Sequence, residues 1–211
     1  MEIKKHFLEN DITVYECEIP VALDLMTASD RSGYHQSTKN VRAESRRSEI
    51  IVTNLLIKDI FGPKAVLCHE ASGAPYVEVD GSRSDKCISI SHSNRYAVVA
   101  VSPRQAGIDV EEPHERVMRV REKFLSPEEL RFTGTSVWRT TLAWTAKEAL
   151  FKCIPESGVD FIGDLSLSLS DIREFAPTSL FKATAYGRPY RLMSHFENDR
   201  IFTLAVPDYE K

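Results

Sequence analysis

The sequence predicts an α+β protein made of two halves, and three observations carry this prediction. The chain has 211 residues, of which 42% are hydrophobic and 9% aromatic, so it can bury a substantial core. Its local patterns run strand, helices, strands and then repeat in the same order. A turn-forming stretch, SPRQAG at residues 102–107, separates the two runs. We therefore expect two pseudo-symmetric halves, residues 1–103 and 104–211, each a small antiparallel sheet packed with helices.

The first half is expected to contain strands around one long helix. Its first strand is predicted at residues 11–19, and Pro20 then opens a short helix over residues 20–30. Residues 40–62 form a long helix that is mostly apolar on one side, and Gly62-Pro63 ends it. The remaining predicted strands are 65–70, 75–79, 87–93 and 96–102.

The second half begins with a short strand at residues 108–112. Ser126 followed by Pro127, with Glu129 three residues after the serine, is the signature of a capping box at a helix start. A more apolar helix then ends near Cys153. The predicted strands that close the chain are 165–169, 180–186, 190–196 and 200–207.

Charge and composition narrow the functional classes. The net charge of −4 gives no reason to expect a nucleic-acid partner. The first ten residues, MEIKKHFLEN, lack the apolar core of a secretory signal, and the chain has no run of apolar residues long enough for a membrane span. Its four cysteines are scattered without zinc-binding spacing. We expect a cytoplasmic protein with neither a membrane nor a nucleic-acid partner.

One helix of the second half carries charges in an apolar setting. The stretch LAWTAKEALFKC, residues 142–153, reads as a buried helix, yet Lys147, Glu148 and Lys152 lie inside it. One interpretation is an exposed stripe on which Glu148 and Lys152 form an i,i+4 ion pair. The other is a cleft where the charges meet a ligand with phosphates and a metal. The helix alone favours the exposed stripe, because most helical charges are solvated.

Two carboxylates precede this helix in the sequence AGIDVEE. Asp109 and Glu111 are two residues apart on a predicted strand, so their side chains point to the same face. Such a pair repels unless a cation lies between its members, and Mg²⁺ typically takes one or two protein carboxylates. A glutamate of the helix could add a third oxygen ligand or act as a base. A solvated strand face is the alternative.

A third motif, ISISHSNRYAVV, contains His92 between Ser91 and Ser93 at the junction of two predicted strands. Hydroxyls, backbone N–H groups and imidazole can all donate hydrogen bonds to a phosphate. The alternative is a turn histidine that is bonded to the backbone.

Together these motifs resemble the 4′-phosphopantetheinyl transferase family. GIDVE, WTAKEALFK, SISHS and GAP at residues 73–75 occur in the family's order between residues 40 and 155. The length and the two-half layout resemble the monomeric surfactin-synthetase type and not the shorter trimeric holo-acyl-carrier-protein synthase type. The resemblance implies an active site at the interface of the halves. Residues 1–103 would supply the CoA 3′-phosphate and adenine side, and residues 104–211 the metal and catalytic side.

The resemblance also implies a role for each matched residue. Catalytic roles fall to Glu148, Lys152 and Asp109. The metal ligands for Mg²⁺ or Mn²⁺ are Asp109, Glu111 and Glu148. Contacts with CoA are implied for Arg46 or Arg47, Gly73, Pro75, Ser91, His92, Lys147 and Lys152. The upstream basic contacts have only Lys39 and Arg42 as candidates, because the surrounding sequence does not match the family cleanly.

The implied activity is that of a holo-[acyl-carrier-protein] synthase. Phosphopantetheine would pass from CoA to a serine of an apo acyl or peptidyl carrier protein, with release of 3′,5′-ADP. We expect a monomer whose acceptor contacts lie around residues 117–132. A non-catalytic CoA- or carrier-binding module and a metal-dependent phosphohydrolase are the alternatives.

Overall fold

The computed structural model describes residues 2–9, 11–19, 38, 41–172 and 177–208. Within these residues the protein has an α+β fold with antiparallel sheets and four α-helices, which confirms the predicted fold class. The chain divides into two compact units, Met1–Arg104 (unit 1) and Gln105–Lys211 (unit 2). The pseudo-symmetry of the halves stays a prediction. In the described part of the chain, no helix is long and apolar enough to cross a membrane.

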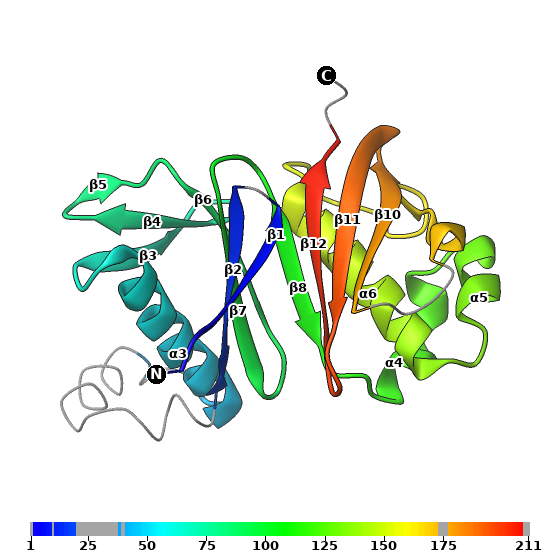
Figure 1. Ribbon diagram of the computed structural model, residues 1–211, viewed down its shortest axis with the longest axis horizontal. Helices are drawn as coiled ribbons and strands as arrows, with labels where there is room; N and C mark the ends of the chain where they lie inside the picture. Colours follow the sequence, from blue (N-terminus) through cyan, green and yellow to red (C-terminus); the bar gives the residue numbers. More distant parts are fainter. Residues whose placement is uncertain (1, 10, 20–37, 39–40, 173–176, 209–211) are drawn as a thin grey trace. The chain divides into compact units, whose positions relative to one another are not determined.

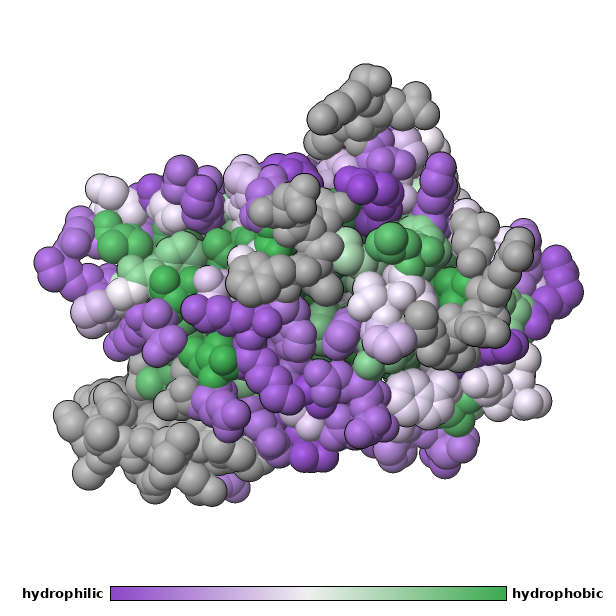
Figure 2. Space-filling view, in the orientation of Figure 1, coloured by the Kyte–Doolittle hydropathy of each residue, from purple (hydrophilic) through white to green (hydrophobic). Residues whose placement is uncertain are grey.

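Unit 1 contains two antiparallel sheets and one long helix among its described residues (Figure 1). The four-stranded sheet consists, in spatial order, of β1 (Lys4–Glu9), β2 (Ile12–Glu18), β7 (Tyr96–Ser102) and β6 (Cys87–His92). The three-stranded sheet consists of β3 (Ala65–His69), β4 (Pro75–Val79) and β5 (Ser82–Arg83). Figure 2 shows hydrophobic and hydrophilic residues intermixed over this small sheet.

Helix α3 (Glu44–Phe61) supplies the core of unit 1. Glu44 in its first turn and Lys58 in its last turn complement the helix dipole. Gly62 ends the helix at a φ of 100°, and its N–H donates to the Lys58 carbonyl. The buried residues that join this helix to the four-stranded sheet include Val52, Leu56, Ile57, Ala97 and Val99. This packing brings one face of α3 against β7 and β3, and the hydrogen bond between Thr53 and His92 joins the helix to the end of β6.

Unit 2 is built on one five-stranded antiparallel sheet. Its strands, in spatial order, are β8 (Gly107–Glu111), β12 (Ile201–Pro207), β11 (Arg188–Phe196), β10 (Thr178–Ala185) and β9 (Leu165–Leu167). Helix α6 (Val137–Cys153) packs on β8 and β12 (Figure 1). The shorter elements are α4 (Arg116–Val120), the 3₁₀ turn η1 (Arg121–Lys123), α5 (Pro127–Thr133) and the 3₁₀ turn η2 (Leu169–Asp171).

Gly107 sets the separation between β8 and α6. A Cβ atom at this position would lie 2.0 Å from the carbonyl oxygen of Ala149 and 2.7 Å from the backbone nitrogen of Cys153. Only a residue without a side chain fits such a close approach. The strand therefore runs directly under the helix, and side chains of β8 can reach groups on α6.

The structure confirms most elements that the sequence predicts and changes a few. The capping box of α5 is present, because Ser126 Oγ accepts from Glu129 N at 3.3 Å and Glu129 Oε2 accepts from Ser126 N at 2.7 Å. Helix α3 begins at Glu44 and not at residue 40. The strands β1 and β5 and the helix α4 are absent from the sequence prediction. The helix predicted at residues 20–30 lies outside the described residues.

Candidate functional site

Asp109 and Glu111 project from β8 toward α6. They alternate with Ile108 and Val110, so both carboxylates share the strand face on which Gly107 meets the helix. Asp109 is only 4% exposed, and Glu111 is half-buried. The antiparallel pairing of β8 with β12 fixes this orientation, because Asp109 lies opposite Thr203 in the register.

Helix α6 faces these carboxylates with three side chains spaced by four residues. Trp144, Glu148 and Lys152 recur at this interval and therefore share one side of the helix. Lys152 Nζ donates to Asp109 Oδ1 at 2.7 Å and to the Ile108 carbonyl at 3.1 Å. Trp144 Nε1 donates to Glu111 Oε1 at 3.0 Å. The helix thus holds both carboxylates of the strand, one through an ammonium and one through an indole.

The surroundings of the site raise the pKa values of both of its glutamates. Burial raises the pKa of Glu111 to about 7, and the negative charge of Asp109 adds to this effect, while the hydrogen bond from Trp144 and the charge of Lys152 oppose it. Burial, followed by the charge of Asp109, also raises the pKa of Glu148 to about 7, again against Lys152. Near neutral pH each of these carboxyl groups therefore exists in both protonation states.

The donor set fits a hard divalent cation. Three carboxylates face a single ammonium, and two of them hold protons more tightly because their negative charges are crowded and desolvated. Oxygen ligands of this kind suit Mg²⁺. In the described structure the oxygens of the three residues do not all lie within 4.8 Å of one another. A cation would have to draw them together and compete with Lys152 for Asp109.

Lys147 lies away from this group, contrary to the expectation that it contacts CoA phosphate. Its side chain is 0% exposed, and its Nζ lies 2.8 Å from Glu129 Oε2. The same ammonium donates to the carbonyls of Phe161 at 2.6 Å and Leu165 at 3.0 Å. An ammonium has three N–H donors, and three acceptors surround this one. The geometry therefore leaves Lys147 no donor for a phosphate.

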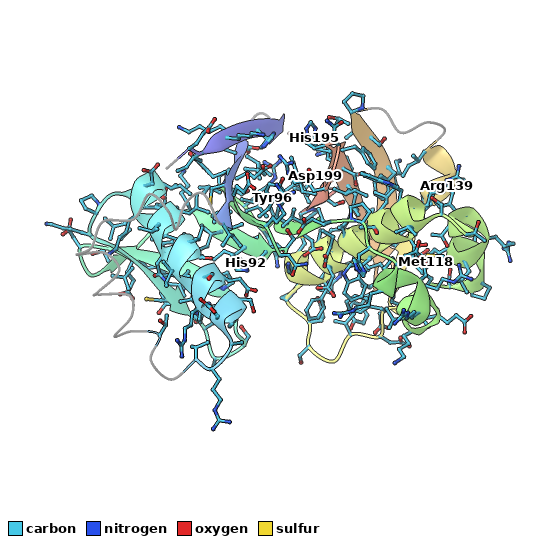
Figure 3. All side chains as sticks on the ribbon, turned by 90° about the horizontal axis from the view of Figure 1, so that it is seen from below. His92, Tyr96, Met118, Arg139, His195 and Asp199 are labelled. Atoms are coloured by element: carbon cyan, nitrogen blue, oxygen red, sulfur yellow. The ribbon has the colours of Figure 1, made fainter. Side chains whose placement is uncertain are left out.

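His92 lies in unit 1 at the end of β6, beside α3 (Figure 3). Its Nε2 forms a hydrogen bond with Thr53 Oγ1 of α3, and the same hydroxyl donates to the Glu49 carbonyl at 2.7 Å. A threonine hydroxyl has one proton, so with that proton on Glu49 the oxygen accepts from the Nε2–H of His92. The bond fixes the orientation of the imidazole relative to α3.

The other side chains of unit 1 that are predicted to contact CoA have different partners and orientations. Arg46 forms an exposed ion pair with Glu49 at 2.7 Å, and the Nε of Arg47 donates to the Val41 carbonyl. Strand alternation turns Ser91 to the sheet face opposite that of His92.

Gly73 and Pro75 belong to the hairpin that joins β3 to β4. Gly73 adopts a φ of 90°, and its N–H donates to the Glu70 carbonyl at 2.9 Å. Pro75 opens β4 opposite His69. Of the upstream basic candidates, Lys39 lies outside the described residues, and Arg42 is exposed before the start of α3.

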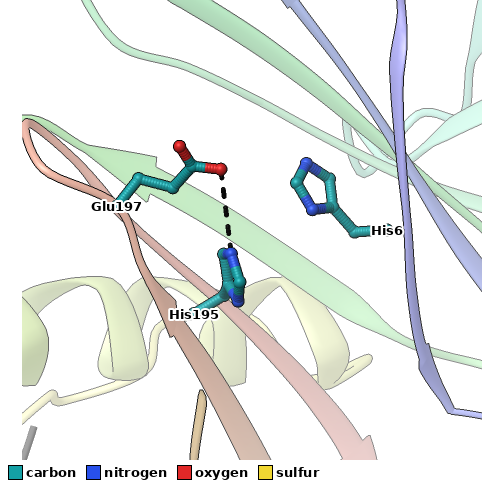
Figure 4. A group of neighbouring side chains, drawn as sticks. All are labelled: His6, His195 and Glu197. Carbon is teal, nitrogen blue, oxygen red and sulfur yellow. Dashed lines mark ion pairs between the residues drawn. The ribbon is translucent and has the colours of Figure 1, made fainter. Parts of the chain in front are cut away.

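Each unit also contains a histidine paired with a glutamate outside these groups. In unit 1, His6 Nε2 lies 3.1 Å from Glu16 Oε2. In unit 2, His195 Nε2 lies 3.8 Å from Glu197 Oε1 (Figure 4). The Nδ1 atom of His195 is 3.1 Å from Thr178 Oγ1. The sequence analysis identifies neither pair: His6 and Glu16 are ten positions apart on two strands, and the two-residue spacing of His195 and Glu197 does not by itself indicate a contact.

Three side chains that shape these groups escape the sequence analysis. Trp144 is part of the quoted motif, but nothing in its spacing indicates a bond to Glu111. Thr53 resembles any other residue on the buried side of a helix. Glu129 is predicted as a capping residue, whereas its contact with Lys147 joins residues 18 positions apart in the sequence and has no local signal.

Comparison with known protein families gives a match over the part of the chain that contains the carboxylate group. Residues 105–205 match the model of the 4′-phosphopantetheinyl transferase superfamily. The matched segment contains Asp109, Glu111, Glu148 and Lys152, whereas unit 1 lies outside it. No curated protein matches the chain.

Proposed function

We propose that this protein transfers 4′-phosphopantetheine from CoA to a serine of an apo acyl or peptidyl carrier protein. The observation that carries the proposal is the group formed by Asp109, Glu111, Glu148 and Lys152 inside the segment that matches the transferase superfamily. The resemblance noted in the sequence adds the surfactin-synthetase type and a monomeric state, and the cysteine pattern adds action in the cytoplasm. These finer features belong to the proposal.

The reaction is a displacement at phosphorus. The serine Oγ forms a bond to the phosphorus that carries the pantetheine arm, and the bond from that phosphorus to the bridging oxygen of the pyrophosphate breaks. The serine proton passes to Glu148, and 3′,5′-ADP leaves with the bridging oxygen and its electron pair. In the metal-free site, burial and the charge of Asp109 raise the pKa of Glu148 to about 7, close to the working pH at which a base is most effective.

Asp109, Glu111 and Glu148 would hold the divalent metal, Mg²⁺ or Mn²⁺. When bound, the cation supplies positive charge that offsets the charge of the pyrophosphate oxygens. Lys152 complements it from the same side of α6. The Lys152 side chain is 26% exposed, so its ammonium can turn from the Asp109 carboxylate toward a phosphate oxygen.

Unit 1 would recognise the 3′-phosphate of CoA through His92, whose imidazolium would donate from Nδ1 because its Nε2–H already donates to Thr53. Helix geometry favours Arg46 over Arg47 as the accompanying arginine. Arg46 lies seven residues before Thr53 and thus on the same side of α3 as the contact with His92, whereas Arg47 is rotated by about 100°. The hairpin with Gly73 and Pro75 would contact adenine, as the resemblance implies. Ser91 and Lys147 are left out of this set, because the strand face and the buried ion pair direct them elsewhere.

Carrier recognition is proposed for the segment around residues 117–132, which includes most of α4 and most of α5. Val120 in this segment is 36% exposed, and Met118 lies on the same short helix (Figure 3). Apolar side chains at the surface suit contact with a carrier helix.

Intact-mass spectrometry of a panel of apo carrier proteins tests the proposal. Each carrier is incubated with CoA, Mg²⁺ and the protein, and the controls are EDTA and the variant Glu148→Gln. We expect one carrier to gain a single phosphopantetheine with the wild type and none with either control. Calorimetry should show that Glu148→Gln still binds CoA.

The alternatives give other products. Bound CoA without turnover on any carrier would identify a binding module, and a hydrolysed phosphate ester without carrier modification would identify a phosphohydrolase. Normal turnover by Glu148→Gln would refute the assignment of Glu148 as the base.

A further inference from the structure

The Lys147–Glu129 pair is the most deeply buried ion pair in the described part of unit 2. The two side chains are 0% and 2% exposed, and their charged atoms are 2.8 Å apart. Glu129 also accepts hydrogen bonds from the backbone N–H of Ser126 at 2.7 Å and of Leu167 at 3.1 Å. The pair therefore joins the start of α5 and the strand β9 to helix α6.

Stability alone does not explain such a pair. Removing two charges from water costs several kcal/mol per ion, and apolar residues of similar volume often replace buried ion pairs at no loss of stability. Lys147 is the only charged residue on the buried side of α6, among Ala143, Ala146 and Leu150. What the pair does provide is a fixed geometry for the groups that it bonds.

One of these bonded groups, the Phe161 backbone, is connected to the carboxylate site through the rings of Phe161 and Trp144. Lys147 Nζ holds the carbonyl of Phe161 at 2.6 Å. The Phe161 ring lies 6.0 Å from the Trp144 ring, centroid to centroid, and Phe124 contacts the same indole edge-on at 4.8 Å. The Trp144 Nε1–H in turn donates to Glu111 at 3.0 Å. The segment that Lys147 anchors therefore places the Phe161 ring on one side of the Trp144 indole.

We propose that Lys147 and Glu129 are positioning residues for Glu111, acting through Phe161 and Trp144. The pair fixes residue 161 against α6, the Phe161 ring confines the Trp144 indole, and the indole holds the Glu111 carboxylate. The catalytic meaning of this arrangement rests on the proposed function, but the positioning itself does not. Lys147 and Glu148 are neighbours on α6, so one anchors the helix in the core while the next presents its carboxylate to the site.

The emission of Trp144 reports this positioning without metal or substrate. The background variant Trp138→Phe leaves Trp144 as the single tryptophan. In this background, Lys147→Met with Glu129→Gln removes both charges and keeps side chains of similar length. We expect red-shifted emission and stronger quenching by acrylamide, because the indole loses its fixed wall. Far-UV circular dichroism checks that the variant is folded.

The control removes an ion pair elsewhere in unit 2 that is not deeply buried. Arg188 and Glu156 are paired at 2.9 Å, but the arginine is 64% exposed. Arg188→Gln with Glu156→Gln should leave the emission of Trp144 unchanged. The variant Phe161→Leu, which retains the backbone carbonyl that Lys147 holds, should reproduce the Trp144 change. It therefore tests the path even if the double variant of the buried pair fails to fold.

The functional readout is the Mg²⁺ concentration for half-maximal transfer. We expect the variant of the buried pair to raise it about tenfold, as loss of outer-shell support does at metal sites, with little change in the KM for CoA. Unaltered Trp144 emission in the folded double variant and in Phe161→Leu would overturn the inference. If the wild type modifies no carrier, the proposed function fails, but the emission of Trp144 still decides the positioning.

Discussion

At the residue scale, Glu111 and Glu148 are the carboxyl groups of the site whose ionised forms are disfavoured. Both are buried near Asp109, and the pKa of each is raised from the usual glutamate value of 4.5 to about 7. Lys152 is the counter-charge that opposes both shifts. Without a cation, burial and the neighbouring negative charge therefore favour the protonated forms of these two carboxyl groups.

This electrostatic imbalance predicts the pH dependence of stability. Between pH 4.5 and about 7 the folded protein binds more protons than the unfolded chain, so the free energy of unfolding falls as the pH rises. We expect a loss on the order of 2 kcal/mol, which lowers Tm by roughly 4–8 °C. Thermal unfolding in EDTA at pH 5 and pH 8 measures it. Mg²⁺ should restore part of the loss at pH 8, because it favours the ionised forms.

The control for this prediction is the double variant Glu111→Gln with Glu148→Gln. Its side chains are neutral at both pH values, so its Tm should differ less between them than that of the wild type. An equal difference in both proteins would attribute the pH dependence to other groups.

Residue-scale prediction from sequence succeeds where local geometry decides the outcome. Strand alternation puts Asp109 and Glu111 on one face whatever surrounds them. Lys147 and Lys152 look alike in the sequence, yet one points into the core and the other to a carboxylate of β8. The difference depends on partners that only the tertiary fold supplies.

At the scale of elements, the site depends on the packing of α6 against β8. The closest approach is at Gly107, where the helix backbone itself occupies the space of a side chain. Asp109 lies two residues further along the same strand. Any displacement of the helix at Gly107 therefore also moves Lys152 relative to Asp109.

The substitution Gly107→Ala tests this packing. The new methyl group would lie 2.0 Å from a backbone oxygen, which cannot rotate away, so α6 must shift. We expect a destabilisation of about 3 kcal/mol, measured by urea unfolding. Gly163→Ala is the matched control, because its Cβ would meet only the flexible Asp160 side chain at 3.0 Å. A similar cost for both substitutions would show that the contact with α6 is not the cause.

The elements that the sequence predicts carry a recognisable local pattern, and the short ones that it misses do not. Strand β10 alternates, with every second residue buried, whereas β12 is a continuous run of buried residues. Helix α4 has only five residues, too few for a helical period to appear, and β5 has only two. Their formation depends on neighbours that are distant in the sequence.

At the scale of the whole molecule, the two units are proposed to have different roles in the reaction. Unit 2 carries the carboxylates and Lys152 and would determine the rate and the metal dependence. Unit 1 carries His92, whose ring is held on α3 by Thr53, and would determine the affinity for the 3′-phosphate of CoA. Contacts remote from the reacting phosphorus are expected to change KM more than kcat when they bind substrate and transition state equally.

Dephospho-CoA, which lacks the 3′-phosphate, separates the two contributions. His92→Ala should raise the KM for CoA about 10- to 100-fold, since it removes a hydrogen bond to a charged group. The same variant should leave the KM for dephospho-CoA close to the wild-type value, because that substrate has no phosphate for the imidazole to contact. Equal losses with both substrates would mean that His92 acts through the packing of β6 on α3. Glu148→Gln should show the opposite pattern, with a lower kcat for both substrates and their binding retained, because Glu148 is proposed to act in proton transfer and metal binding and not in contact with the 3′-phosphate.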